Sequence, residues 1–281
     1  MAVDKYEIDG VSQDTVIAAR ELALAGNDNR NWVNDHTVYT HGYGVVAAYG
    51  NKVTADGQPE FFESGIPTQG KLTESEKYEP RIYFSPNTTE YSIVGAPEAR
   101  SLGVRLPDRF GRRPDHVQGD GGPSVGNLFS RILYAIRFGS DQILFSDRVT
   151  SESQILYDRS PKERVAKVAP YLTLDGRVYP AVVDGRVKWI VDGYTTSDAY
   201  PYSQMTDLGS ATKDSTTVSS ATVSSLGSQK ANYIRNSVKA TVDAYDGSVD
   251  LYVWDQSDPV IKHGRRSSPA STTSSPISPA T

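Results

Sequence analysis

“VYPAVVDGRVKWIVDGYTT”, residues 178–196, contains the strongest β-hairpin pattern in the sequence. Two runs rich in Val, Ile and Trp lie on either side of the dipeptide Asp184-Gly185. Asp-Gly suits a two-residue turn with positive φ angles, and the twist of that turn matches the twist of paired antiparallel strands. The segment therefore predicts two antiparallel strands that turn at Asp184-Gly185.

A second hairpin is predicted in “VKATVDAYDGSVDLYVWD”, residues 238–255, with its turn at Asp246-Gly247. A helix is predicted just before it, near residues 229–237. Shorter strands are predicted at 60–67, 81–86 and 90–97. These hairpins and helices lack the regular strand–helix alternation of βαβ units. The sequence therefore predicts an α+β fold with separate β-hairpins and a few short helices.

Two predictions concern the N-terminal part of the chain. Residues 12–25 place apolar residues at helical spacing after Ser12, which predicts a helix capped near that serine. Residues 37–50 mix β-branched and aromatic residues with Gly42 and Gly44, and this mixture is typical of a bulged strand or a buried turn.

Two further helices are predicted in the middle of the chain. Residues 124–139 contain the clearest one, which Gly139 ends; four apolar residues form one stripe along it, namely Leu128, Ile132, Leu133 and Ile136. The other helix is predicted at 160–169, with Ser160 as its cap and Pro161 in its first turn. Its inward-facing residues are predicted to be Val165 and either Val168 or Ala169.

Composition excludes several classes of function. The chain has 281 residues and a formal net charge of −5, which argues against non-specific binding to nucleic acid, since that needs a basic surface. It has no Cys, so disulfides, thiolate metal sites and cysteine nucleophiles are excluded. No run of 18 apolar residues occurs, and “MAVDKYEIDG” lacks the basic and apolar parts of a signal peptide.

The histidines do not form a metal-binding pattern. His36 and His41 are five residues apart, which matches neither one face of a helix nor one face of a strand. A structural role within an aromatic layer is the favoured interpretation, with metal binding as the alternative. “HGYG” at 41–44 resembles an oxyanion loop but has no companion G-x-S-x-G motif. “GDGGPSVGN” at 119–127 lacks the Lys-Ser/Thr of a phosphate-binding loop, and a flexible loop is favoured over an anion site.

The segment 189–203, “WIVDGYTTSDAYPYS”, is the best candidate for a ligand-binding surface. Aromatic rings with nearby carboxylates suit stacking on a sugar or contact with a peptide. The predicted surface consists of Trp189, Asp192, Tyr194, Asp198, Tyr200 and Tyr202. An equally weighted interpretation is that these aromatic residues cover a hydrophobic edge at the end of the hairpin.

Acidic residues raise the alternative of a hydrolase. A glycoside hydrolase needs two carboxyl groups facing each other across the sugar, and the acidic candidates near aromatic residues are Glu60, Glu63, Asp175, Asp184, Asp192 and Asp198. The proposed pair is Glu63 with Asp192 or Asp198, because Asp184 is better explained as a turn residue. No acid/base motif supports this pair, and the sequence favours a non-enzyme without catalytic, cofactor-binding or metal-ligating residues.

Long strings of the sequence resemble a known family. “NWVNDHTVYTHGYGVVAAYGN”, “ERVAKVAPYLTLDG” and “NYIRNSVKATVDAYDGSVDLYVWD” are similar to the uncharacterised protein family 0182, from about Val3 to Lys262. Its members are large bacterial membrane proteins with N-terminal transmembrane helices and a long extracytoplasmic region. The resemblance implies a cell-membrane location on the extracytoplasmic side, with the missing N-terminal membrane helices as a partner. It implies no reaction and carries over no functional residues.

The sequence departs from this family at both ends. It lacks the membrane helices, so Met1 is expected to mark a truncated gene start or a fragment. After Lys262 the family pattern is lost, and 12 of the 15 residues from 267 to 281 are Ser, Thr or Pro. Residues 263–281 are predicted to be a disordered tail that arose from a frameshift. Resequencing should find one missing base near codon 263, and an intact reading frame would contradict this prediction.

The resulting functional prediction is a binding or interaction module of a bacterial cell-envelope protein. Residues 1–262 are expected to be an incomplete extracytoplasmic α+β region with a flexible Ser/Thr-rich excursion at 207–228. The candidate partners are cell-wall glycan and peptide, but not nucleic acid. The alternatives are the envelope hydrolase and a purely structural domain that packs on its own membrane part, which predicts a large exposed apolar patch.

Overall fold

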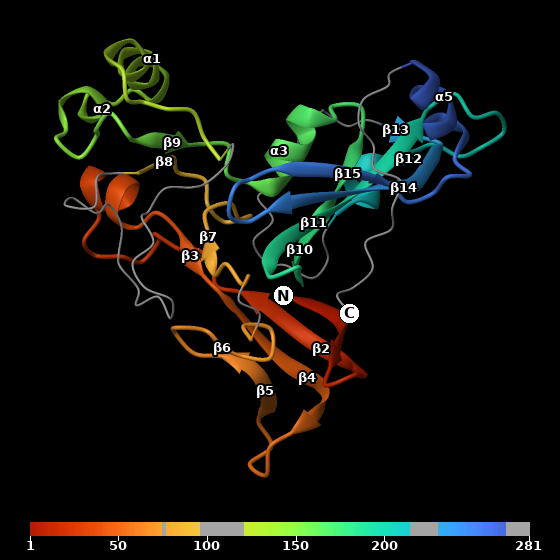
Figure 1. The fold of residues 1–281 in the computed structure, drawn as a ribbon. Coiled ribbons are helices and arrows are strands. Elements are labelled where there is room, and N and C mark those ends of the chain that lie inside the picture. The colour runs from red at the N-terminus through yellow and green to blue at the C-terminus, as the bar shows by residue number, and fades with distance from the viewer. Residues whose placement is uncertain (75–76, 96–120, 214–229, 268–281) are drawn as a thin grey trace.

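Figure 1 shows the computed structural model, which describes residues 1–74, 77–95, 121–213 and 230–267. In the last of these ranges, side chains are described up to His263. Over the described residues, two larger antiparallel sheets and three two-stranded pairs are connected by short helices. This arrangement confirms the predicted α+β class with separate hairpins.

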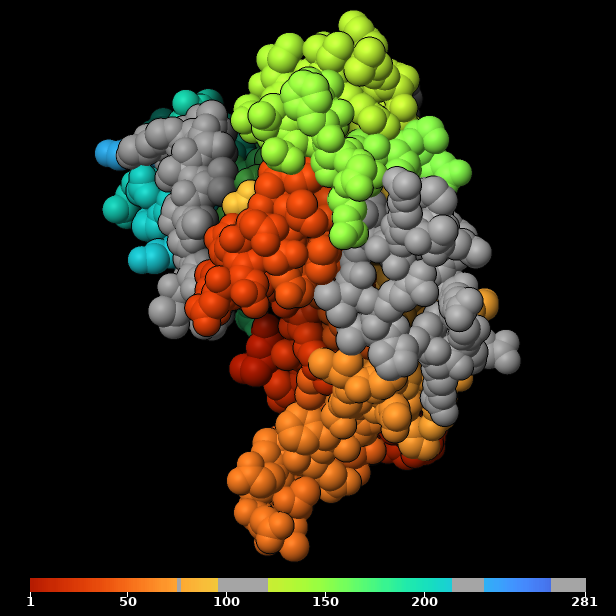
Figure 2. Space-filling view, turned by 90° about the vertical axis from the view of Figure 1, so that its left-hand side faces the viewer, coloured from red at the N-terminus to blue at the C-terminus, as the bar shows by residue number. Residues whose placement is uncertain are grey.

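The N-terminal sheet, red to orange in the lower part of Figure 1, has the strand order β1-β2-β4-β5-β6. Its strands are β1 (Ala2–Ile8), β2 (Val11–Ala19), β4 (Val45–Val53), β5 (Pro59–Ser64) and β6 (Gln69–Gly70). All of its neighbouring strands are antiparallel. The hairpin tip between β4 and β5 extends away from the rest of the molecule, as the orange arm in Figure 2 shows.

The helix predicted at 12–25 is wrong, because residues 11–19 form strand β2. Asp9 and Gly10 adopt positive φ angles of 53° and 75° and turn the chain back into a hairpin with β1. Within β2, Thr15 and Ile17 are buried on one face. Pairing with β1 and β4 supplies backbone hydrogen bonds on both sides, and this outweighs a weak helical periodicity.

The second sheet has the strand order β10-β11-β14-β15. Its strands are β10 (Thr173–Val183), β11 (Arg186–Ser197), β14 (Tyr233–Asp243) and β15 (Val249–Val253). The turn between β10 and β11 has positive φ at Asp184 (51°) and Gly185 (75°), and Gly247 (74°) has positive φ in the turn before β15. Both predicted hairpin turns are therefore confirmed.

The helix predicted near 229–237 is also wrong. These residues contribute to β13 (Lys230–Ala231) and to the start of β14, which is an inner strand paired with both β11 and β15. The predicted excursion 207–228 begins with ordered structure, since β12 (Thr206–Asp207) pairs with β13 and leads into α4 (Leu208–Ala211). Residues 214–228 lie outside the described part of the chain.

Two predicted helices are confirmed as α1 (Leu128–Phe138) and α3 (Pro161–Val168). Asn127 caps α1 by accepting a hydrogen bond from the Ser130 amide at 2.8 Å, and Gly139 ends it with a left-handed φ of 62°. Along α3, Val165 and Ala169 are buried whereas Val168 is exposed. The shorter helices are α2 (Gln142–Phe145) and the π-helical turn η1 (Asn34–Val38).

The main hydrophobic core joins the two sheets and α3. Ile17 and Val45 of the N-terminal sheet belong to the same cluster as Val187 and Val191 of the second sheet. A hydrogen bond also links the two sheets at this core, because the Val182 amide donates to the Tyr6 hydroxyl at 2.8 Å. Burial raises the pKa of Tyr6 to about 12, so the hydroxyl stays protonated.

A second core lies beneath α1 and α2, where β8 (Ser92–Val94) pairs with β9 (Gln154–Leu156). The predicted strands at 60–67, 81–86 and 90–97 are found as β5, β7 (Arg81–Ile82) and β8. Residues 37–50 contain the end of η1, the short strand β3 (Gly42–Tyr43) and the start of β4. Strand β3 pairs with β7.

Arg159 connects these segments from a fully buried position. Its guanidinium donates to the carbonyl oxygens of Thr40 at 2.5 Å, Tyr83 at 2.6 Å and Glu90 at 3.2 Å, and to the Ser92 hydroxyl at 2.6 Å. Burial lowers the pKa of Arg159 to about 9. One side chain thus satisfies acceptors from three separate stretches of backbone.

The C-terminal helix α5 runs from Pro259 to Ser267. The predicted start of the disordered tail, His263, therefore lies inside a helix, and residues 268–281 lie outside the described part of the chain. Ile261 packs against the small cluster formed by Ala169, Leu172 and Val238. Among the residues that the structure describes, none of the helices has the length and apolar composition needed to cross a bilayer.

Candidate functional site

The second sheet has one face that belongs to the core. Along β11, Val187, Trp189 and Val191 alternate on this side and all are buried. Trp189 is only 2% exposed, and its indole Nε1 donates to the Phe84 carbonyl at 2.7 Å. Trp189 is therefore a core residue, and its predicted place in a ligand-binding surface has to be corrected.

The opposite face of this sheet carries polar and aromatic side chains. Asp192 is the register partner of Lys239, and Lys239 is in turn the partner of Tyr252, so the three lie in one row across β11, β14 and β15. The Lys239 ammonium also lies 5.5 Å from the ring centroid of Trp254. The side chains gathered here, called the Lys239 face below, are Asp175, Asp192, Tyr194, Lys239, Tyr252 and Trp254.

Two polar pairs organise the Lys239 face. Lys239 forms an ion pair with Asp192, and both side chains are half-buried. Tyr194 donates its hydroxyl hydrogen to Asp175 at 2.6 Å. Burial, followed by the bond to Asp175, raises the pKa of Tyr194 well above its ordinary value, so this hydroxyl remains a donor at neutral pH.

Trp254 is the most exposed aromatic ring of this face, with 54% of its surface accessible. An indole held beside a paired ammonium offers a flat apolar surface next to charged hydrogen-bonding groups. Trp254 and Lys239 lie outside the surface predicted from the sequence. The alternation of side chains along the 238–255 hairpin contained the signal that could have found them. It puts Lys239 and Trp254 on the face opposite the buried valines of β14.

The remaining predicted surface residues lie beyond the end of β11. Tyr200 stacks on Tyr233 with ring centroids 5.8 Å apart, and its amide donates to the Asn232 side chain at 3.0 Å. Asp198 is exposed, and Tyr202 is fully exposed with a positive φ of 59°. The six predicted residues are therefore divided among the core (Trp189), the Lys239 face (Asp192 and Tyr194) and this loop.

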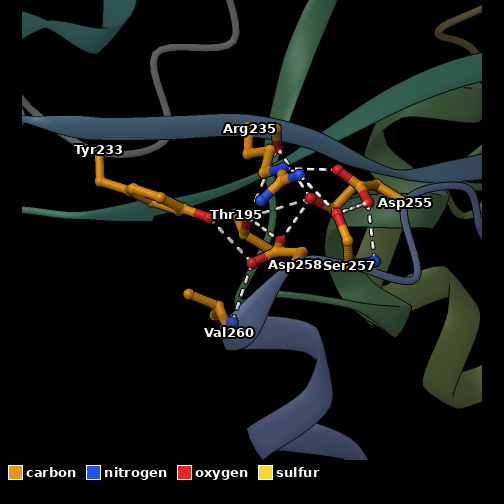
Figure 3. A network of polar contacts seen from close by, with 8 residues as sticks. Thr195, Tyr233, Arg235, Asp255, Ser257, Asp258 and Val260 are labelled. Atoms are coloured by element: carbon orange, nitrogen blue, oxygen red, sulfur yellow. Dashed lines mark hydrogen bonds and ion pairs between the residues drawn. The ribbon is translucent and has the colours of Figure 1, made fainter.

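A buried carboxylate, Asp258, anchors the same end of the sheet (Figure 3). It accepts hydrogen bonds from the Thr195 hydroxyl at 2.6 Å, the Tyr233 hydroxyl at 3.0 Å, the Val260 amide at 2.9 Å and the Ser237 hydroxyl. Burial acts to raise the pKa of Asp258, but these hydrogen bonds outweigh it and the net pKa is lowered.

The role of Asp258 is structural, because it caps the first turn of α5 and joins that helix to β11 and β14. Beside it, Arg235 pairs with Asp255 at 2.5 Å and donates to the Ser257 hydroxyl at 2.7 Å (Figure 3). The Asp-Pro dipeptide at 258–259 is a helix-start signal that the sequence analysis did not use.

The two histidines have structural contacts. Nδ1 of His36 lies 2.7 Å from the Tyr91 carbonyl oxygen, and its ring stacks on Tyr91 with centroids 3.9 Å apart. Nδ1 of His41 lies 3.0 Å from the Thr40 hydroxyl. Burial, then the nearby charges of Arg81 and Arg159, lowers the pKa of His41 to about 3. These contacts agree with the favoured structural interpretation.

The two members of the proposed catalytic pair lie in different sheets, with Glu63 on β5 and the alternatives Asp192 on β11 and Asp198 directly after it. Glu63 is fully buried on β5, where its carboxylate accepts from the amides of Leu72 at 2.9 Å and Thr73 at 3.3 Å. Burial raises the pKa of Glu63. Asp192 is paired with Lys239 on the second sheet, and Asp184 occupies the hairpin turn. The described residues therefore lend the hydrolase hypothesis no support.

The glycine-rich segment 119–127 is described from Gly121 onward. Gly121 and Gly122 line a hollow of about 270 Å³, together with Arg164 and Lys167. Lys167 is already paired with Asp158, and the Arg164 guanidinium donates to the Gly247 carbonyl at 2.7 Å. These two cations are therefore engaged within the protein.

Comparison with known proteins gives a consistent family match. The model of an uncharacterised protein family, UPF0182, matches residues 1–273. A UPF0182 protein of Bifidobacterium longum is 92% identical over 263 residues, which is 93% of this chain and 25% of the relative. Similar proteins occur in Bifidobacterium adolescentis (84% identical, 93% of this chain and 24% of the relative) and in an Arthrobacter species (60%, 92% and 26%). No solved structure matches the chain.

Proposed function

This chain belongs to the uncharacterised protein family UPF0182, and on that premise we propose that it is a binding module of the bacterial cell envelope. The chain spans about a quarter of the length of the relatives it matches, so the module is one part of a longer polypeptide in those relatives. Its place on the extracytoplasmic side of the membrane is part of the same proposal and rests on the family resemblance.

The Lys239 face is the proposed binding surface, and one observation carries this proposal. The half-exposed indole of Trp254 lies beside the Asp192–Lys239 pair. Indole rings supply a large rigid contact for a flat apolar ligand surface, such as one face of a sugar ring. The neighbouring carboxylate and ammonium can accept from and donate to ligand hydroxyl or amide groups, and such charge-assisted bonds are the stronger ones.

The second polar pair supports the same ligand class. The Asp175 carboxylate accepts from the Tyr194 hydroxyl at one oxygen and from the Arg177 amide at the other, at 2.7 Å, which leaves one lone pair on each oxygen as an acceptor. Groups that are already paired on a sheet lose little freedom when a ligand binds. Two carboxylates against one ammonium disfavour a polyanion, so a neutral or zwitterionic ligand such as a cell-wall glycan or its peptide fits best.

Tryptophan fluorescence tests this proposal, because the three Trp residues differ in environment. Trp189 is buried, Trp32 donates to the Tyr91 hydroxyl at 2.8 Å, and Trp254 is half-exposed. Titration with soluble cell-wall muropeptides should change the emission of the wild-type protein. The change should be absent in Trp254→Phe, and Trp254→Ala should weaken binding by about tenfold or more.

Trp32→Phe is the matched control, since this indole packs against the second core and is not part of the Lys239 face, so its removal should leave binding unchanged. A wild-type emission that responds to none of the fragments, or a response that survives in Trp254→Phe, would contradict the proposed surface. Circular dichroism of each variant checks that the fold is retained.

A second candidate function is a structural domain that packs against another part of the longer polypeptide. The specific observation is a row of apolar residues on the outer face of the N-terminal sheet, where Val3, Val16, Ala48 and Phe61 are successive register partners. Val16, Ala48 and Phe61 of this row line a hollow of about 370 Å³. The test compares the cooperativity of unfolding of this chain with that of the full-length Bifidobacterium relative. Unfolding of equal cooperativity and stability would count against a shared core.

A further inference from the structure

Helix α1 carries apolar side chains on two opposite sides. Its inner side packs on the second core through Tyr134, Ala135 and Phe138. Its outer side carries five large apolar residues that are all exposed, namely Leu128, Phe129, Ile132, Leu133 and Ile136. A helix that is apolar on both sides needs a second apolar environment.

The exposed residues form one continuous surface. At 100° per residue, the five side chains fall on a single arc of about 140° around the helix. Three of them are more than two-thirds exposed: Leu128 at 68%, Phe129 at 71% and Ile136 at 75%. Phe145 of the adjoining helix α2 is 80% exposed. Together these six residues are called the α1 arc below.

Helices α1 and α2, which carry the α1 arc, lie at a convex end of the molecule. Figure 2 shows the yellow-green segment that contains α1 and α2 as a rounded cap at the top of the molecule, and Figure 1 shows both helices at the edge of the fold. A convex apolar surface can enter a soft medium without a preformed complementary groove. Exposed apolar patches of this kind mark protein or membrane contact sites.

Three features favour a lipid bilayer over a protein partner. The α1 arc contains no side chain that can form a hydrogen bond, whereas protein interfaces carry about one hydrogen bond per 100–200 Å². The charged residues of α1 are both basic; on the helical wheel Arg137 borders the arc, whereas Arg131 lies on the inner side of the helix. The residues of the arc are long Leu, Ile and Phe side chains, as in helices that lie in the membrane interface.

Both arginines are held by contacts within the protein, and the exposed Arg137 is the one that lies beside the arc. Nε of Arg131 donates to the Val125 carbonyl at 3.0 Å, and the Arg137 guanidinium lies 4.5 Å from the Tyr157 ring centroid. Guanidinium groups bind phosphate oxygens well. The residues that flank α2 add the exposed carboxylates Asp141 and Asp147, so apolar insertion rather than net charge should dominate the affinity.

We propose that α1 and α2 form an interfacial membrane contact, in which the α1 arc enters the boundary between the head groups and acyl chains of a bilayer. This inference goes beyond ligand binding, since it concerns a different surface and a different partner from the Lys239 face. In this arrangement α1 lies parallel to the membrane surface and its inner side stays packed on the second core.

Vesicle flotation tests the proposal on the intact chain. Wild-type protein should float with vesicles of phosphatidylcholine mixed with phosphatidylglycerol. The double variant Phe129→Ser/Ile136→Ser should lose at least about tenfold in partitioning, because two exposed apolar side chains no longer insert. Both residues are surface-exposed, so the variant should fold normally, which circular dichroism and the melting temperature will check.

Phe61→Ser is the matched control, because Phe61 is an equally large and 53% exposed residue on the N-terminal sheet. It should float like the wild type. Absence of wild-type flotation, or an equal loss in Phe61→Ser, would overturn the proposal. Self-association that the double variant abolishes, without vesicle binding, would assign the α1 arc to a protein contact and would also overturn it.

The two proposals fail independently. The double variant should still bind muropeptides if the Lys239 face is the ligand site, and Trp254→Ala should still float if the α1 arc binds lipid. If the wild-type protein binds muropeptides but does not float with vesicles, only the proposed membrane contact is overturned.

Discussion

Asp192 and Lys239 are register partners on β11 and β14, and their side chains pair on the side of the sheet opposite the buried ring of Trp189. One strand thus supplies a core residue and a surface residue three positions apart. The hydrophobic side is fixed by contact with the N-terminal sheet and α3. The polar side carries the proposed ligand-binding surface.

Removal of one member of this pair should destabilise the fold modestly. Lys239→Met keeps the length of the side chain but leaves the half-buried Asp192 carboxylate without its cation, at a cost of about 1 kcal/mol in the free energy of unfolding. Urea denaturation measures this cost. Lys5→Met is the control, since Lys5 and Asp14 form a largely exposed ion pair 3.4 Å apart. An equal loss in both variants would contradict the assigned role.

Arg159→Lys should destabilise the protein much more. The planar guanidinium reaches acceptors on Thr40, Tyr83, Glu90 and Ser92, and an ammonium group cannot reproduce that geometry. Buried carbonyl groups left unsatisfied should lower the free energy of unfolding by about 2–3 kcal/mol or more. Arg148→Lys, at an exposed position, should stay within about 0.5 kcal/mol in the same urea titration. Similar midpoints for the two variants would disprove this role of Arg159.

His41 should make the fold sensitive to acid. Its pKa is lowered to about 3 in the folded protein, below the value near 6.5 of the unfolded chain. Between these values the unfolded chain binds more protons, so stability falls as pH decreases from about 6.5 to about 3, at up to about 1.4 kcal/mol per pH unit.

The measurement for His41 is the pH dependence of urea denaturation for wild type and His41→Asn. The difference between their slopes isolates His41, because groups such as Glu63, whose pKa burial raises, titrate in both proteins. Wild type should lose stability more steeply below pH 6.5. Parallel slopes would mean that His41 is solvated in the folded state.

Asp258→Ala should loosen α5 and the end of the second sheet. It removes the helix cap at Val260 and leaves the buried hydroxyls of Thr195 and Ser237 without their acceptor. The expected loss is about 2–3 kcal/mol, read from urea denaturation and from hydrogen exchange in α5. Asp198→Ala, at an exposed position, is the matched control and should have little effect. Unchanged exchange in α5 after Asp258→Ala would refute the capping role.

Local sequence patterns were sufficient to predict those elements whose structure is determined by neighbouring residues. The Asp184-Gly185 and Asp246-Gly247 turns were predictable because few residue pairs adopt the required φ angles readily. Helix α1 was predictable from Gly139 and its apolar periodicity. By contrast, 12–25 and 229–237 were predicted as helices, although strand pairing with distant segments determines their structure.

The candidate surface was predictable only in part for the same reason. Asp192 and Tyr194 were found because the 189–203 segment is rich in aromatic and acidic residues. Lys239 and Trp254 join them through cross-strand register, which is a long-range property. Trp189 has the same kind of neighbours in the sequence as an exposed binding residue. It lies in the core because its side chain points to the buried face of β11.

The sequence alone determined the family, through long strings shared with its members. It also determined the α+β class, the two Asp-Gly hairpins and the exclusion of cysteine chemistry, because these depend on composition or on local sequence patterns. Tertiary structure decided which face of each element is buried. It placed Trp189 inside and Trp254 outside, and it left the apolar arc of α1 exposed. The physical reason is that burial depends on what packs across a sheet or helix, and those contacts join residues that are far apart in the chain.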